Sequence, residues 1–200
     1  TYFGTDDYDQ AYFVQLDTED RPHLCGQTVG SDMELVGDVY ATNPLGSTFV
    51  VRLTENLESV DFLTRVGLSM VGVDISPTAF LVSDCDEMYI SGWGGVTNSS
   101  NSGYANQSTS NGLPTTVDAF QIGTDGSDFW LGVLAPEAAD LTYGTYFGGP
   151  FSNEHVDGGT SRFDKNGTVY QAVCAGCGGW DDFPSITGAW SSTNKSSNCN

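Results

Sequence analysis

The pentapeptide TYFGT at Thr1–Thr5 returns as TYFGG at Thr145–Gly149, and LTRVG at Leu63–Gly67 occupies the corresponding place between them. Self-similarity of this kind is typical of proteins built from one supersecondary unit that recurs along the chain. We interpret each of these segments as the last strand of a unit.

An alternating segment that leads to an Asp-rich turn follows each of these strand ends. The three copies are AYFVQLDTED (Ala11–Asp20), TAFLVSDCDE (Thr78–Glu87) and TSRFDKNG (Thr160–Gly167). Alternation of apolar and polar residues, a turn rich in Asp, Asn and Gly, and renewed alternation predict a β-hairpin. We align the three turns at Asp17, Asp84 and Asp164.

Two further strands complete each predicted unit. STFVVRL from Ser47 and SDFWLGVL from Ser127 align at Phe49 and Phe129, and a fourth strand returns the chain to the start of the next unit. Upstream, LPTTVDAF from Leu113 matches FPSITGAW from Phe183. Four short strands per unit, with a period of about 65–80 residues, predict an all-β fold made of four-stranded antiparallel β-propeller blades.

The predicted organisation begins and ends inside a unit, which is expected of an incomplete part of a larger propeller. Residues 1–5 form the last strand of a preceding blade and 6–67 form a blade. Residues 68–149 form a blade with a long Ser/Asn/Gly-rich loop at 95–112, and 150–200 form an incomplete blade.

Composition narrows the classes of partner. The chain carries 6 Lys and Arg against 26 Asp and Glu, for a net charge of −20. Binding to a nucleic-acid backbone needs clustered cations, so this acidity argues against a nucleic-acid partner. No apolar run approaches the roughly 20 residues of a membrane-spanning helix, which predicts no membrane span. At 38% hydrophobic residues the chain can still build a core.

The repeated motifs resemble a known family. TYFGG, FDKNGTVY, FPSITGAW and LPTTVDAF together are similar to the SBBP-type β-propeller repeats of very large bacterial surface proteins. The third unit most resembles the version in gliding-motility-associated, type IX-secreted proteins of the Bacteroidota. This resemblance implies export to the outer cell surface or the medium and a role as scaffold or adhesive platform. It brings no catalytic motif.

The cysteines offer the sharpest local signal. Cys174 and Cys177 form a Cys-x2-Cys pair, and Cys199 follows. Zinc is one interpretation, with His155 and Cys199 as the residues that would complete a four-ligand site. An exported protein favours disulfides instead, either Cys177–Cys199 or Cys174–Cys177. The remaining two cysteines are predicted to be small buried residues: Cys25 and Cys85.

Acidic turns offer a second candidate site. The calcium candidates are Asp17, Asp20, Asp84 and Asp86, since Ca²⁺ takes six to eight oxygen ligands. The alternative is hairpin chemistry, in which Asp accepts hydrogen bonds from the turn backbone. No cofactor is predicted apart from this calcium alternative.

Few residues fit a catalytic or glycan-binding pattern. The histidines are His23 and His155, and no G-x-S-x-G segment is present, so nothing supports a Ser/His/Asp triad. Trp93 and Trp180 lie among glycines and could form a sugar platform, although packing between blades also explains them.

The sequence therefore predicts a non-catalytic structural or adhesive propeller module of a large secreted surface protein. Its partners would be the remaining blades of the same chain and a surface glycan or protein ligand. The alternatives are a carbohydrate-binding propeller or propeller-based glycan-active enzyme, and a protein-docking platform in a secretion or gliding-motility assembly.

Overall fold

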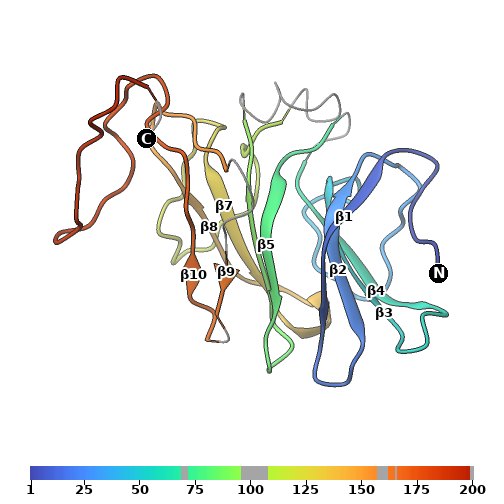
Figure 1. The fold of residues 1–200 in the computed structure, drawn as a ribbon. Helices are drawn as coiled ribbons and strands as arrows, with labels where there is room; N and C mark the ends of the chain where they lie inside the picture. Colours follow the sequence, from blue (N-terminus) through green and yellow to red (C-terminus); the bar gives the residue numbers. More distant parts are fainter. Residues whose placement is uncertain (69–71, 96–107, 157–161, 165, 199–200) are drawn as a thin grey trace.

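A computed structural model describes residues 1–68, 72–95, 108–156, 162–164 and 166–198 of this chain (Figure 1). Every strand pairing between its named strands is antiparallel, and the described residues contain no α-helix. The predicted all-β class and the four-stranded antiparallel sheets are confirmed.

Two complete sheets follow one another along the chain, each with its strands in sequence order. The strands of the first sheet are β1 (Asp9–Leu16), β2 (Pro22–Thr28), β3 (Thr48–Leu53) and β4 (Val60–Val66). Those of the second sheet are β5 (Ser76–Val82), β6 (Met88–Trp93), β7 (Phe129–Leu134) and β8 (Leu141–Phe147). A short third ladder joins β9 (Arg162–Phe163) and β10 (Val169–Tyr170).

The first hairpin of each sheet turns through the same side-chain chemistry. Asp17 Oδ1 accepts the backbone N–H groups of Glu19 and Arg21, both at 2.9 Å. Asp164 Oδ1 accepts those of Asn166 and Thr168 in the third unit. A side-chain oxygen that accepts N–H groups two and four residues ahead holds the turn closed. The hairpins predicted from sequence are therefore present in all three units.

In the second unit the equivalent turn residue is a serine. Ser83 Oγ accepts the N–H groups of Cys85 and Glu87, and the Ser83 N–H bonds to the Glu87 carbonyl as that of Asp17 does to Arg21. The sequence alignment placed Asp84 at this position. It is one residue out of register.

The ladders shift the alignment of the third strands by one residue as well. Gly26 of β2 pairs with Phe49, whereas Gly92 of β6 pairs with Trp130. A β-bulge opposite each of these glycines marks them as equivalent. Phe49 therefore corresponds to Trp130 and not to Phe129, and Ser47 corresponds to Asp128.

A hydrophobic core fills the space between the two sheets. Its members from the first sheet include Cys25, Val50 and Phe62, and those from the second include Phe80, Val82, Ile90 and Trp130. The opposite face of the first sheet carries a second cluster built on Phe49, Val51 and Leu63. The first sheet thus has two apolar faces, which is why its central strand β3 reads as a nearly continuous hydrophobic run.

Polar contacts tie the sheets together at both ends of this core. The guanidinium of Arg52 on β3 donates two hydrogen bonds of 2.5 Å to Glu137, which lies in the one-turn 3-10 helix Pro136–Ala138 of the second unit. Gln27 Nε2 on β2 donates to the Ile75 carbonyl at 2.7 Å. Both side chains of the first sheet are buried, whereas the Glu137 carboxylate is partly exposed.

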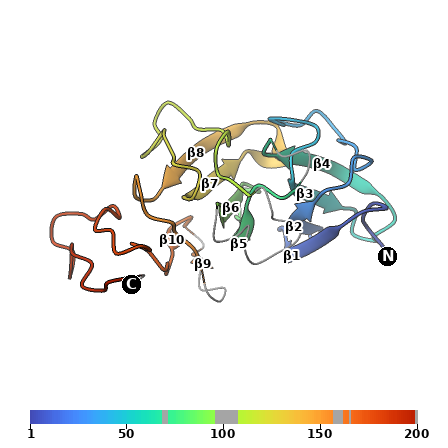
Figure 2. The same cartoon turned by 90° about the horizontal axis from the view of Figure 1, so that it is seen from above.

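The first strands of successive units lie side by side. β5 contacts β1 on one side and β9 on the other. Figure 2 shows β1, β5 and β9 along one flank of the molecule, with β4 and β8 on the opposite flank. The strand order of each sheet therefore runs from one flank to the other.

The ends of the chain add little regular structure. Thr1–Thr5 form no strand, and Phe3 packs on Phe49 with ring centroids 5.8 Å apart. After β10, residues 175–198 form turns without a strand. The proposed blade boundaries stay predictions. Within the described residues no helix has the length and apolarity needed to cross a membrane.

Candidate functional site

The calcium candidates lie in two separate hairpin turns. Asp17 and Asp20 belong to the β1–β2 turn, and Asp84 and Asp86 to the β5–β6 turn. Asp20 and Asp86 adopt the same left-handed backbone conformation, with φ 61° each. Asp17 is engaged by the turn N–H groups and by Arg21 Nε at 2.8 Å. Its geometry is that of the hairpin alternative.

The two tryptophan candidates have different environments. Trp93 is only 7% exposed and packs against His155 with ring centroids 5.9 Å apart, as the packing interpretation expects. Trp180 is 48% exposed and stacks on Phe151 at 5.3 Å. Of the pair, Trp180 alone presents a large part of its ring to solvent.

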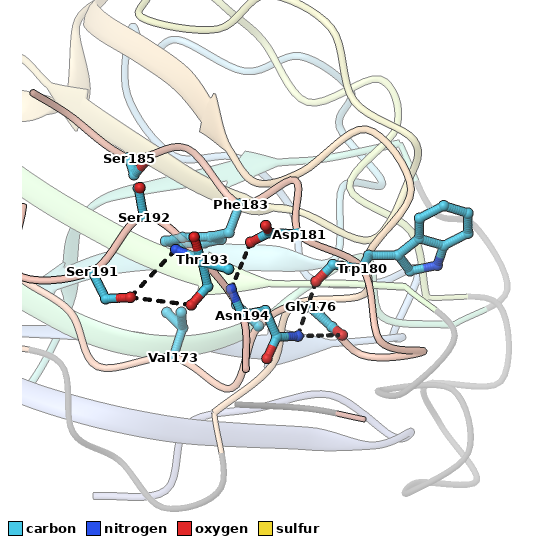
Figure 3. A pocket seen from close by; sticks show the side chains of 11 residues that line it. Val173, Gly176, Trp180, Asp181, Phe183, Ser185, Ser191, Ser192, Thr193 and Asn194 are labelled. Atoms are coloured by element: carbon cyan, nitrogen blue, oxygen red, sulfur yellow. Dashed lines mark hydrogen bonds between the residues drawn. The ribbon is translucent and has the colours of Figure 1, made fainter. Parts of the chain in front are cut away.

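Trp180 borders a polar pocket of about 220 Å³ in the segment after β10. Its lining includes Asp181, Phe183, Ser191 and Asn194 (Figure 3). The Asn194 amide donates to the carbonyls of Gly176 and Trp180, so it is used to hold the loop. Figure 3 shows the Trp180 indole pointing away from the other lining side chains. The ring therefore does not cover the pocket as a stacking platform would.

Sequence reasoning missed a carboxyl group that closes each junction between units. At the first junction the Asp74 carboxylate accepts the hydroxyl of Ser47 at 2.8 Å and the N–H of Leu68 at 3.1 Å. Ser47 directly precedes β3 and Leu68 follows β4, whereas Asp74 leads into β5. Asp74, which leads into the second sheet, thus accepts hydrogen bonds from residues at the end of the first sheet.

The second junction places two buried carboxyl groups face to face. Glu154 accepts the N–H of Gly149 and the hydroxyl of Ser152. Glu154 Oε2 and Asp128 Oδ1 accept no hydrogen bond, and both residues are fully buried. Both oxygens lie within 2.6 Å of the point where a Cβ at Gly148 would sit, so a side chain there would displace the pair.

Burial of two adjacent carboxyl groups disfavours ionisation of both at once. Burial and the neighbouring Asp128 carboxylate raise the pKa of Glu154 to about 8. Burial also raises the pKa of Asp128. We therefore expect the pair to hold one proton at neutral pH.

Glu154→Gln is expected to flatten the pH dependence of stability. The pKa of Glu154 is higher in the folded chain than its ordinary value of 4.5. Its protonation therefore stabilises the fold fully below that ordinary value and progressively less as pH rises toward 8. Wild-type protein should lose several degrees of melting temperature between pH 5 and 8, whereas the amide of the variant stays neutral beside Asp128. Thermal melts over this range measure both slopes.

Glu58→Gln serves as the matched control because Glu58 lies in an exposed turn. Its pH profile should follow that of the wild type. Identical slopes for Glu154→Gln and wild type would show that the pair carries no shared proton.

The cysteines fall into three environments. Cys25 is fully buried, and burial raises the pKa of its thiol to about 12. Cys85 is exposed in the β5–β6 turn, so the prediction that it is buried was wrong. Cys177 is disulfide-bonded, whereas Cys174 is a thiol, so the Cys174–Cys177 pairing is not the one present. Cys199 lies outside the described residues.

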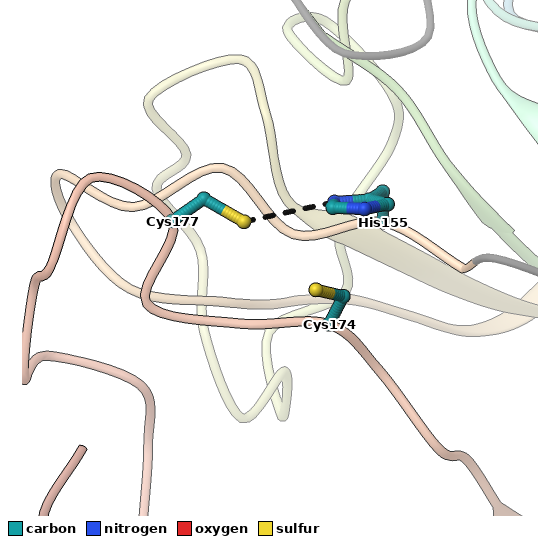
Figure 4. A group of neighbouring side chains, drawn as sticks. All are labelled: His155, Cys174 and Cys177. Atoms are coloured by element: carbon teal, nitrogen blue, oxygen red, sulfur yellow. Dashed lines mark hydrogen bonds between the residues drawn. The ribbon is translucent and has the colours of Figure 1, made fainter. Parts of the chain in front are cut away.

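The Cys-x2-Cys pair meets a histidine from the opposite strand segment. His155 and Cys174 exchange two backbone hydrogen bonds of 3.1 and 2.9 Å. Cys177 Sγ lies 3.7 Å from His155 Nδ1. Figure 4 shows the three side chains gathered in one space. Within the described part of the chain, this is the group in which three metal-ligating side chains come close together.

Comparisons with known proteins assign no family. No protein-family model matches the chain, and no curated protein shows significant similarity to it. Function has to be argued from the geometry of the chain itself.

Proposed function

We propose that this chain is a run of β-propeller blades that serves as a non-catalytic structural or adhesive module of a large secreted bacterial surface protein. The observation that carries the proposal is a pair of apolar positions on the first strand of a sheet, which are covered in one unit and exposed in the other. In the second unit, Phe80 and Val82 of β5 are 5% and 7% exposed because the first sheet packs on them. The equivalent Val14 and Leu16 of β1 are 63% and 56% exposed.

The equivalence of these residues follows from register. Val14 pairs with Leu24, two ladder positions beyond the pair that Gly26 forms at the β-bulge, and Phe80 has the same relation to the pair that Gly92 forms. Because the same position is apolar in both units, we expect a neighbouring sheet to cover it in both. A further unit of this kind, packed on β1 as the first sheet packs on β5, would bury Val14 and Leu16 and continue the row of first strands.

Secretion is supported by the cysteine chemistry. Cys177 forms a disulfide, and disulfides persist in oxidising compartments. The high acidic charge keeps such a surface protein soluble and argues against nucleic acid as its ligand. A scaffold role also agrees with the buried state of both histidines, which leaves neither one in an open cleft.

Antibodies raised against the folded chain test this proposal on intact cells of the source organism. We expect labelling without permeabilisation of the cells. The double substitution Val14→Asp and Leu16→Asp in the full-length protein should remove most of this signal, because burying two carboxylates against another unit costs several kcal/mol. Val117→Asp, at a fully exposed position, should keep it.

The two parts of the proposal fail separately. Labelling that requires permeabilisation would overturn the surface location. Equal labelling of the double variant and the wild type would overturn the docking of a further unit on β1.

A further inference from the structure

We propose that His155, Cys174 and Cys177 form a zinc site when the disulfide of Cys177 is open, and that the disulfide closes this site. The proposal starts from the three ligand atoms, which all lie within 4.8 Å of one another. Two thiolates and an imidazole are ligands that Zn²⁺ prefers.

The observed spacing already matches that of ligands around one zinc ion. With Zn–S of about 2.3 Å, Zn–N of about 2.0 Å and a tetrahedral angle, a sulfur and a nitrogen ligand lie about 3.5 Å apart. Cys177 Sγ and His155 Nδ1 are 3.7 Å apart. The pair can therefore bind one ion without moving its backbone.

The local backbone explains why the three side chains converge. The paired backbone hydrogen bonds of His155 and Cys174 hold these residues opposite each other on neighbouring segments. Gly176 adopts a left-handed conformation with φ 65°, which reverses the chain between the two cysteines. Cys177 is thereby returned to the side on which His155 lies (Figure 4).

Burial is suited to an ion that enters from solvent. His155 is 8% exposed and is backed by the Trp93 ring, which holds the imidazole in place. Cys174 and Cys177 are half-buried. The site therefore has a fixed inner ligand and two outer ligands that solvent can reach, with a fourth coordination position for water.

Cys177 Sγ can either belong to the disulfide or bind zinc as a thiolate, but it cannot do both at once. A sulfur atom in a disulfide is not a thiolate, so the oxidised chain offers zinc only His155 and Cys174. Opening the disulfide yields two thiols and takes two electrons and two protons. A dithiol reductant supplies both and becomes a disulfide, whereas a phosphine supplies the electrons and becomes its oxide, with the protons and the oxide oxygen coming from water. Zinc then displaces the thiol protons of Cys174 and Cys177 as it binds.

Metal binding to reduced and oxidised protein, with Zn²⁺ and Co²⁺ as probes, tests the proposal. After anaerobic removal of a phosphine reductant, the reduced protein should retain one zinc per chain by elemental analysis. With Co²⁺ it should show thiolate charge-transfer absorption in the near ultraviolet and the intense visible bands of a tetrahedral site. The oxidised protein should show neither.

Matched variants locate the site. Cys174→Ser and His155→Ala should each weaken zinc binding at least about tenfold, because each removes one ligand from a set of three. Cys85→Ser, which removes an exposed thiol outside the cluster, should leave zinc binding unchanged. Circular dichroism of each variant separates loss of the metal from loss of the fold. If His155→Ala does not fold, the zinc content of Cys174→Ser carries the test.

Two results would overturn the proposal. One is equal zinc content in the reduced and oxidised proteins. The other is an equal loss of zinc in Cys85→Ser and Cys174→Ser.

Discussion

Trp130→Ala is expected to lower the free energy of unfolding by about 3–5 kcal/mol, the range for truncation of a large buried aromatic side chain. Trp130 is completely buried in the core between the two sheets. Its indole N–H also donates to the Pro114 carbonyl at 2.8 Å, and this acceptor would lose its partner. Denaturant unfolding monitored by circular dichroism measures the change.

Trp190→Ala is the matched control. Trp190 is fully exposed, so the same truncation at that position should change stability by less than about 0.5 kcal/mol. If the two variants unfold at the same denaturant concentration, the core between the sheets does not hold the fold together.

Arg65→Met is expected to cost a similar amount, about 3–5 kcal/mol, although it replaces a charged residue with an unbranched apolar one. Arg65 is 1% exposed. Its guanidinium donates to the carbonyls of Gly46 at 2.7 Å and of Gly30 and Met33 at 3.0 Å each. Three buried carbonyl groups would be left without a donor in the variant.

Arg162→Met tests whether the effect belongs to the site or to the residue type. Arg162 is exposed on β9, and its loss should be nearly neutral. Stability of Arg65→Met equal to or above that of the wild type would mean that burial of the guanidinium costs more than its three hydrogen bonds return. Equilibrium unfolding of both variants distinguishes these cases.

The hairpins could be predicted from sequence because their signal is local. A turn needs only an oxygen-bearing side chain a few residues before the second strand, and Asp17 and Asp164 supply it. The alignment failed at Asp84 for the same reason. In the second unit the Ser83 hydroxyl accepts the backbone N–H groups of the turn. The alignment chose the neighbouring Asp84 because its carboxylate resembles those of Asp17 and Asp164.

The junction carboxyl groups could not be found in the same way. Asp74 and Glu154 follow Gly67 and Gly148 at unequal distances, so they do not align in a repeat of fixed length. Their partners, Ser47 and Asp128, lie far back in the chain and differ in chemistry. Only the folded chain brings each carboxyl group to the strand end that it caps.

The identity of the zinc ligands could be predicted from the sequence, but their closeness in space could not. The Cys-x2-Cys motif predicts Cys174 and Cys177 as ligands, and His155 is one residue that could complete the set. Their closeness depends on the pairing of His155 with Cys174 across two segments, which spacing alone does not specify. Trp93 and Trp180 have similar neighbours in the sequence but differ in burial. Burial depends on which part of the fold packs on each ring, and the local sequence does not specify that.

The unequal junctions give the chain a preferred order of disassembly. The first is closed by a hydroxyl that donates to a carboxylate, and raising the pH does not remove that proton. The second buries Glu154 beside Asp128, and the pKa of Glu154 is raised to about 8, so alkaline solution ionises this group. Mild alkali should therefore loosen the second junction before the first, and solution pH sets which junction is the weaker.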